Sequence, residues 1–178
     1  RCDRSIEKPR KRVSTMILYH GTIMPVPSPL AHIGREELDF GKGFYLTKIK
    51  EQAEAWARKK MFIEHASRAV LNVYEFDSEA AIGSGISYLS MPQYDKEWLD
   101  FVVGNRKGHN HWRAYKVIEG GVANDRVIDT VEDYMTGRIT AEQALGQLRF
   151  AKPNHQICIL DQQVIDTYLH FVESVEIK

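Results

Sequence analysis

Two short segments in the first third of the chain combine side chains and glycines that suit the binding of a flat polar ring. The first, Tyr19-His20-Gly21, ends an apolar run with a ring nitrogen and a glycine whose peptide groups can meet a planar amide. The second places Gly41 and Gly43 before the β-prone run Phe44-Tyr45-Leu46, which sets an aromatic ring at the lip of a strand. The chemistry that these residues predict is the binding of a planar ring that carries an amide.

Each segment alone has an ordinary structural explanation. A histidine that ends a strand is most often a surface or hydrogen-bonded structural residue. A Gly-x-Gly before an aromatic strand is most often part of a turn. The order of the two segments and their spacing of about twenty positions favour a shared site.

The elements that must position these residues belong to a chain of one-domain size. It has 178 residues, 43% of them hydrophobic, with 24 basic and 24 acidic side chains. One core is therefore expected, and nothing indicates a general nucleic-acid or membrane-surface binder. Residues 1–15 are interpreted as a basic tail or linker, and residues 16–178 as a single folded domain.

The hydrophobic pattern predicts strands interleaved irregularly with short helices. The expected strands cover residues 16–20, 44–46, 69–76, 115–118, 156–160 and 171–177. The expected helices cover residues 48–65, 95–108, 127–135, 140–148 and 161–168. This order favours an α+β domain over a doubly wound one, and no G-x-G-x-x-G opens a helix after a strand.

These motifs resemble those of the ADP-ribosyltransferase superfamily, in its diphtheria-toxin and PARP-like branch with the signature His-Tyr-Glu. Within it the chain is similar to an uncharacterised bacterial family with the motifs L-Y-H-G, L-D-F-G-K-G-F-Y-x-T and N-x-Q-I. Here these motifs are residues 18–21, 38–47 and 154–157, and the similarity extends from Met16 to Ile177. The resemblance implies one ADP-ribosyltransferase-like domain over residues 16–178, with a split mixed β-sheet core, flanking short helices and NAD as substrate.

The resemblance also implies a role for each site residue. His20 would bind the adenosine ribose of NAD, the Gly21 backbone would bond the nicotinamide carboxamide, and Tyr45 would stack on the nicotinamide ring. Trp56, eleven positions after Tyr45, would complete an aromatic sandwich, while core packing explains it equally well. The other predicted NAD-binding residues are Tyr19, Lys42, Gly43 and Thr47. Thr47 is also expected to cap the helix that follows, and Arg35 is either a pyrophosphate ligand or a solvated surface charge.

The third catalytic position departs from the signature, because Gln156 stands where the superfamily has a glutamate that stabilises the oxocarbenium-like cation. An amide oxygen still accepts from the ribose hydroxyl, but it lacks the negative charge, and losing such a contact costs about 3 kcal/mol. Processive polymer synthesis is therefore not expected, whereas mono-ADP-ribosylation remains compatible. Asp39 and Asp125 are candidate replacement acids, although Asp125 is first of all a turn or cap residue.

Two further segments bear on specificity and on metals. The loop over residues 149–155 occupies the place where the superfamily selects its target, and Asn154, two positions before Gln156, disfavours arginine as the acceptor. His109 and His111 have no cysteine or carboxylate partners at ligand spacing. No metal site is therefore expected.

The sequence thus predicts a cytoplasmic bacterial mono-ADP-ribosyltransferase that transfers ADP-ribose from NAD to a macromolecular acceptor, protein or nucleic acid, and releases nicotinamide. A role as an intracellular toxin of the toxin–antitoxin or phage-defence type, with a cognate antitoxin as partner, follows from the family form. The alternatives are a nucleic-acid-modifying transferase and a catalytically weak NAD-binding module. No membrane partner is expected, because no apolar stretch approaches the roughly 20 residues needed to span a bilayer. Two cysteines, Cys2 and Cys158, fit a reducing compartment.

Overall fold

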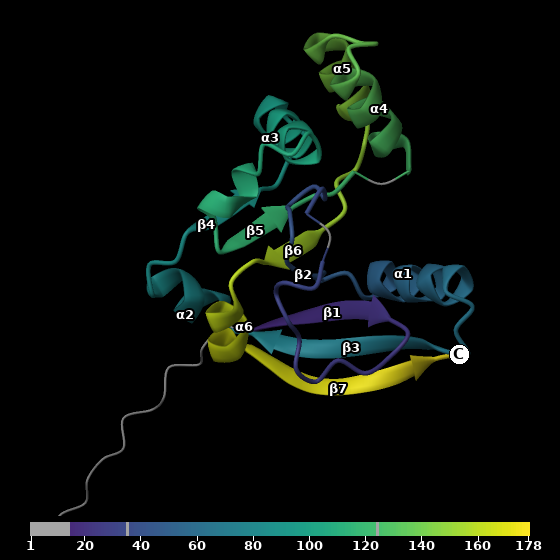
Figure 1. Ribbon diagram of the computed structural model, residues 1–178, viewed down its shortest axis with the longest axis vertical. Helices are drawn as coiled ribbons and strands as arrows, with labels where there is room; N and C mark the ends of the chain where they lie inside the picture. The colour runs from purple at the N-terminus through teal and green to yellow at the C-terminus, as the bar shows by residue number, and fades with distance from the viewer. Residues whose placement is uncertain (1–14, 35, 124) are drawn as a thin grey trace, which may run out of the picture.

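Two β-sheets form the framework of the protein (Figure 1). The computed structural model describes residues 15–34, 36–123 and 125–178, without the side chains of residues 125 and 126. The three-stranded sheet has the antiparallel order β1 (Met16–Thr22), β3 (Ala69–Phe76), β7 (Leu169–Ile177). The four-stranded sheet has the order β2 (Phe44–Leu46), β6 (Gln156–Ile159), β5 (Val117–Gly120), β4 (Tyr88–Met91). Only β4 and β5 run parallel among these strands, so the fold is a mixed α+β fold, as predicted.

Helices cover both sheets. They are α1 (Lys50–Ile63), α2 (Ser78–Gly83), α3 (Lys96–Arg106), the 3-10 helix η1 (His111–Ala114), α4 (Asp125–Met135), α5 (Ala141–Leu148) and α6 (Gln162–Tyr168). Helix α1 lies along the three-stranded sheet, whereas α3, α4 and α5 lie beyond the four-stranded sheet (Figure 1). Among the residues that the structure describes, no helix is both long enough and apolar enough to cross a membrane.

Side-chain caps start several helices where the sequence predicts them. Asp95 accepts a hydrogen bond from the Trp98 amide at the start of α3, and Thr140 forms a capping box with Gln143 at the start of α5. The prediction that Thr47 caps the next helix is wrong. Helix α1 has Ile49 at its N-cap without a side-chain cap bond, and the Thr47 hydroxyl instead accepts from the Ile49 amide at 3.0 Å.

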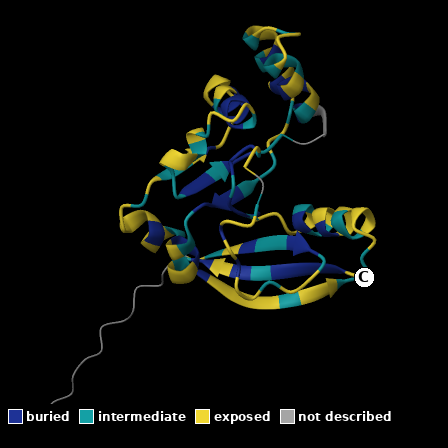
Figure 2. Ribbon diagram, viewed as in Figure 1, coloured by how far each residue is buried: buried dark blue, intermediate teal, exposed yellow. Residues whose placement is uncertain are grey.

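The buried apolar residues form two cores, one on each face of the four-stranded sheet. Figure 2 shows that β3, β5 and β6 are mainly buried, whereas β7 is mainly exposed. The core between the two sheets includes Leu18, Phe44, Leu46, Tyr74, Ile157 and Ile159. The core between the four-stranded sheet and the helices includes Phe40, Trp98, Val102, Ile118, Val131 and Cys158. Strand β6 therefore contributes to both cores, because its successive side chains point to opposite faces.

The two sheets meet at one backbone pair, Tyr19 with Thr47. Their peptide groups exchange hydrogen bonds of 2.8 and 3.0 Å. In a continuing antiparallel ladder the next pair facing this edge would be Gly21 with Tyr45. This pair does not form within the described residues: the Tyr19–Thr47 bridge is isolated, and the Tyr45 carbonyl oxygen accepts from the His20 ring at 2.8 Å instead. Strands β1 and β2 therefore diverge beyond Tyr19.

Strand β7 is the last strand of the three-stranded sheet and is largely exposed along its nine residues. Its exposed apolar side chains include Val172 and Val175. Between them lies Glu173, and Glu176 follows, both exposed.

Candidate functional site

His20 ties β1 to β2 at the point where the two strands diverge. Its Nδ1 lies 2.8 Å from the Tyr45 carbonyl oxygen, and its ring lies 4.6 Å from the Phe44 ring. Burial lowers the pKa of His20 to about 4, so the ring is neutral at neutral pH. Because a carbonyl oxygen only accepts, Nδ1 carries the proton and Nε2 is left as an acceptor.

Tyr45 uses its hydroxyl to hold the glycine turn that precedes it. The hydroxyl donates to the Gly41 carbonyl at 2.6 Å and accepts from the Phe40 amide at 3.3 Å. Burial, the largest cause, keeps the pKa of Tyr45 well above its ordinary value, so this hydroxyl stays protonated. Tyr45 as a whole residue is partly exposed, and its side chain lies on the face of β2 that it shares with Cys158 of β6.

The two glycines of the turn have structural reasons of their own. Gly41 has a φ of 77°, and a Cβ there would lie 2.1 Å from the Trp112 ring. A Cβ at Gly43 would lie 2.5 Å from the Cys158 sulfur. The close approaches that these glycines allow are thus to η1 and β6, and their contact with a ligand stays a prediction.

Gln156 begins β6 beside the predicted aromatic residue. It pairs with Gly120 of β5 and is partly exposed. Gln156 and Cys158 are two positions apart and share a face, and Cys158 is the direct partner of Tyr45. His20, Tyr45 and Gln156 therefore lie on β1, β2 and β6. Strand β2 pairs with β6 and meets β1 at the junction of the sheets.

Trp56 is a surface residue, with 55% of its area exposed, which excludes core packing as its explanation. It lies one helical turn after Gln52 on the same flank of α1. The Gln52 side chain donates to the His155 carbonyl at 2.8 Å and accepts from the His155 amide at 3.3 Å. Trp56 therefore lies on the flank of α1 that faces the loop before Gln156.

Gly21 lets α1 approach β1. A Cβ at Gly21 would lie 1.9 Å from the Ala53 carbonyl oxygen and 3.0 Å from the Ala57 amide nitrogen. The peptide groups of successive residues point to opposite edges of a strand. Those of Gly21, two positions after Tyr19, therefore face the same edge of β1 as those of Tyr19. Gly21 thus has a packing role and also presents its backbone where β1 and β2 diverge.

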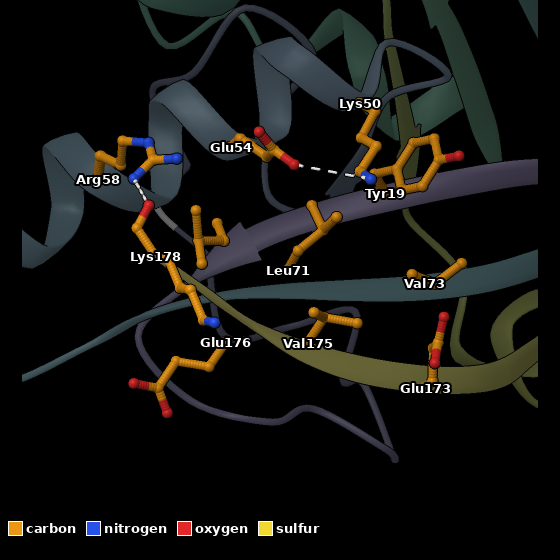
Figure 3. A pocket seen from close by; sticks show the side chains of 11 residues that line it. Tyr19, Lys50, Glu54, Arg58, Leu71, Val73, Glu173, Val175, Glu176 and Lys178 are labelled. Carbon is orange, nitrogen blue, oxygen red and sulfur yellow. Dashed lines mark hydrogen bonds and ion pairs between the residues drawn. The ribbon is translucent and has the colours of Figure 1, made fainter.

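The side chain of Tyr19 lies outside the predicted site. Its ring lines a hollow of about 380 Å³ between α1 and the three-stranded sheet (Figure 3). Lys50, Glu54 and Arg58 form the helical wall, on the flank of α1 opposite Trp56. This hollow does not include His20, Tyr45 or Gln156, so only the backbone of Tyr19 belongs to the junction. Lys42 is partly exposed in the glycine turn.

Asp39 is a structural residue rather than a free acid. Its carboxylate accepts from Arg106 Nε at 2.7 Å and from the Ala123 amide at 2.6 Å, and Asn105 donates to its carbonyl oxygen. These partners hold the start of the glycine turn against α3, which argues against Asp39 as the replacement acid. The side chain of Asp125, the other candidate acid, lies outside the described residues, as does Arg35, the candidate pyrophosphate ligand.

A charged cluster that the sequence did not reveal lies at the same end of the four-stranded sheet. The Glu119 carboxylate accepts from Lys48 Nζ at 2.8 Å, His155 Nε2 at 2.9 Å and the Tyr88 hydroxyl at 2.5 Å. The His155 bond is the largest cause of a Glu119 pKa lowered to about 2. The one available signal was a glutamate within a short apolar strand. Within the described residues, no group of histidines, cysteines and carboxylates is arranged to hold a metal ion.

The chain belongs to the DUF3990 family, described as a protein of unknown function, whose sequence model matches residues 16–171. No curated protein and no solved structure matches the chain. The match therefore covers the four-stranded sheet, strands β1 and β3 and the junction of the sheets, but only the first three residues of β7. The activity is left to be argued from the site.

Proposed function

We propose that the protein is an NAD-dependent mono-ADP-ribosyltransferase that releases nicotinamide. The observation that carries this proposal is the divergence of β1 and β2 beyond the Tyr19–Thr47 pair. It leaves the peptide groups of Gly21 on one side of the gap. On the other side lies Tyr45, whose carbonyl oxygen accepts from His20, and Gln156 is on the neighbouring strand β6.

The nicotinamide end of NAD fits this arrangement by its shape and hydrogen-bonding groups. A carboxamide presents a donor and an acceptor side by side, and the N–H and C=O of an extended residue such as Gly21 do the same. The rings of Tyr45 and Trp56 supply apolar faces for the pyridine ring. The acceptor nitrogen Nε2 of His20 suits a ribose hydroxyl, which donates to it.

The proposed transfer breaks the bond between the anomeric carbon of the ribose and the nicotinamide nitrogen. The bonding electron pair leaves with nicotinamide, and positive charge develops on the ribose. Gln156 Oε1 accepts from the 2′-hydroxyl and orients the sugar as that charge grows. The acceptor nucleophile then bonds to the anomeric carbon and releases its proton to solvent. The acceptor is a protein or nucleic-acid group.

Glu119 does not replace the missing glutamate. It pairs with Ile157, so its side chain lies on the opposite face of the sheet from Gln156. Three donors already occupy its carboxylate. The proposed enzyme therefore works without a carboxylate from β5 under the ribose, which favours a slow, single transfer.

The test of this proposal is to incubate the protein with labelled NAD and a cell lysate, measuring nicotinamide release and macromolecular label. Gln156→Ala is expected to lower transfer by roughly 100-fold with little change in NAD affinity, since the contact strengthens as charge develops. Gln156→Glu is expected to keep activity or raise NAD hydrolysis. Gln163→Ala, at an exposed position of α6, is the matched control. Wild-type transfer by Gln156→Ala would contradict the assigned role.

The same assay separates the alternatives. Label that protease removes identifies a protein acceptor, and label that nuclease removes identifies a nucleic-acid acceptor. NAD binding without nicotinamide release would identify a catalytically weak NAD-binding module, the alternative that the amide at Gln156 favours.

The proposed biological role is that of an intracellular toxin neutralised by a cognate antitoxin. Expression inside bacterial cells is then expected to arrest growth, and Gln156→Ala is expected to restore it. Growth arrest that persists in the alanine variant would separate toxicity from transfer.

A further inference from the structure

The two residues before Gln156 are anchored in different directions by their side chains. Asn154 Oδ1 accepts from the Val122 amide at 2.8 Å, in the segment that leads from β5 to α4. His155 Nδ1 lies 3.1 Å from the Lys48 amide nitrogen, and His155 Nε2 lies 2.9 Å from Glu119. The entry to β6 is thus fixed on both sides.

The hydrogen bonds define the state of the His155 ring. A backbone N–H only donates, so Nδ1 is the acceptor for Lys48 and carries no proton. The proton therefore lies on Nε2, which donates to the Glu119 carboxylate. Both nitrogens are occupied within the protein, and the side chain is only 15% exposed. His155 is consequently built to hold a position rather than to exchange a proton with a substrate.

The residues that bond to His155 or to Glu119 come from several different parts of the fold. Lys48 follows β2, Gln52 lies in α1, Tyr88 lies in β4 and Glu119 lies in β5. Glu119 accepts from Lys48, Tyr88 and His155. Gln52 bonds both the N–H and the C=O of residue 155. The backbone that carries Gln156 is thereby fixed relative to β2 and to the flank of α1 that bears Trp56.

We propose that His155 and Glu119 are positioning residues for the proposed transfer, because they hold the first residue of β6 so that the Gln156 amide faces the junction of β1 and β2. This inference rests on the proposed function. The link between the two side chains is the Nε2–H bond to the carboxylate. Neither side chain contacts the substrate, so their loss changes the turnover number kcat more than the Michaelis constant KM for NAD.

Two substitutions at position 155 separate the two ring nitrogens. His155→Gln keeps a donor near the place of Nε2 and loses the acceptor for the Lys48 amide. His155→Asn keeps an acceptor near the place of Nδ1 and loses the donor to Glu119. Glu119→Gln removes the charge while nearly preserving volume, and His32→Asn, at an exposed loop position, is the matched control.

The experiment measures kcat and KM for nicotinamide release by each full-length variant, normalised to the folded fraction from circular dichroism. His155→Asn and Glu119→Gln are expected to lower kcat 10- to 100-fold, since a shift of about 1 Å at a reacting group can cost about 100-fold. His155→Gln is expected to retain kcat within about threefold, and KM is expected to stay within about twofold throughout.

Three outcomes overturn the inference. Wild-type kcat in both His155→Asn and Glu119→Gln shows that the pair does not position Gln156. Equal losses in His155→Gln and His155→Asn show that the Nε2 link is not the bond that matters. A wild-type protein that binds NAD without releasing nicotinamide refutes the proposed function itself, and this inference with it.

Discussion

A neutral histidine at the junction of two sheets makes the stability of the protein depend on pH. The unfolded chain binds a proton at His20 near its ordinary pKa of 6.5, whereas the folded protein does so only near 4. As pH falls from 6.5 to 4, the unfolded state is protonated first, so the free energy of unfolding is expected to fall by about 1.4 kcal/mol per pH unit, or about 3 kcal/mol in total.

Urea denaturation at pH 7, 5.5 and 4.5 measures this effect. His20→Asn keeps a donor for the Tyr45 carbonyl and does not titrate, so its stability is expected to vary less over the same interval. His32→Asn, an exposed control, is expected to follow the wild type. The Glu119 contribution is lost only as pH falls from 4.5 towards 2, because its folded pKa is about 2. The same dependence of the free energy of unfolding on pH in the wild type and in His20→Asn would show that His20 is not its source.

Under the proposed function, the exposed Trp56 is expected to report NAD binding by its fluorescence. Trp98 is fully buried and Trp112 packs on Gly41, whereas Trp56 is 55% exposed. NAD is expected to quench tryptophan fluorescence, and Trp56→Ala is expected to remove most of that signal and weaken binding about tenfold, the value of one aromatic contact. Phe62→Ala, an exposed aromatic on the same helix, serves as the control and should leave the titration unchanged. Full quenching in Trp56→Ala would move the ring-binding position elsewhere.

At the scale of elements, the contact between α1 and β1 depends on the missing side chain at Gly21. Gly21→Ala is expected to lower the free energy of unfolding by about 2–3 kcal/mol, because the atoms that a Cβ meets are helix backbone and cannot rotate away. Gly146→Ala has open space around it in α5 and is expected to stabilise by about 0.5–1 kcal/mol. Guanidinium denaturation of both variants gives the comparison. A neutral Gly21→Ala would show that α1 shifts freely on the sheet.

The elements that the sequence predicts well are those with local signals. The capping box at Thr140 and the cap at Asp95 locate α5 and α3, and apolar alternation locates β3. Helix α2, strand β4 and η1 are absent from the predictions, because each is six residues or shorter and has no such pattern. Strand β4 is defined by its parallel pairing with β5, which is a tertiary interaction.

The residues of the site also differ in whether a local sequence signal predicts them. The motifs predict a strand at each of His20, Tyr45 and Gln156, and these residues lie in β1, β2 and β6. Their shared role in a site stays a prediction. The Glu119 cluster joins residues 36 positions apart in one bond and 71 in another, which no local pattern encodes. The sequence leaves Trp56 open between core packing and the site, and its exposure in the structure excludes core packing.

At the scale of the whole molecule, the ion pair between Asp39 and Arg106 connects the glycine turn to the helices beyond the four-stranded sheet. Its side chains are 7% and 17% exposed, respectively. Arg106→Ala is expected to lower the free energy of unfolding by about 3 kcal/mol, because it leaves the buried Asp39 carboxylate without its cation. Lys96→Ala removes an exposed ion pair with Asp100 and is expected to cost less than about 1 kcal/mol. Urea denaturation measures the free energy of unfolding of both variants, compared at an unchanged m value. Equal losses in Arg106→Ala and Lys96→Ala would contradict a stabilising role for the ion pair between Asp39 and Arg106.

Strand β7 bears on how copies of the protein coexist at high concentration. An edge strand of nine residues with exposed valines can pair through its backbone with another extended chain, including β7 of a second copy (Figure 1). Glu173 and Glu176 place negative charge along that strand, and charge on an edge strand opposes the stacking of identical strands into fibres. Two carboxylates on this edge strand thus help to decide whether the protein stays dispersed or polymerises.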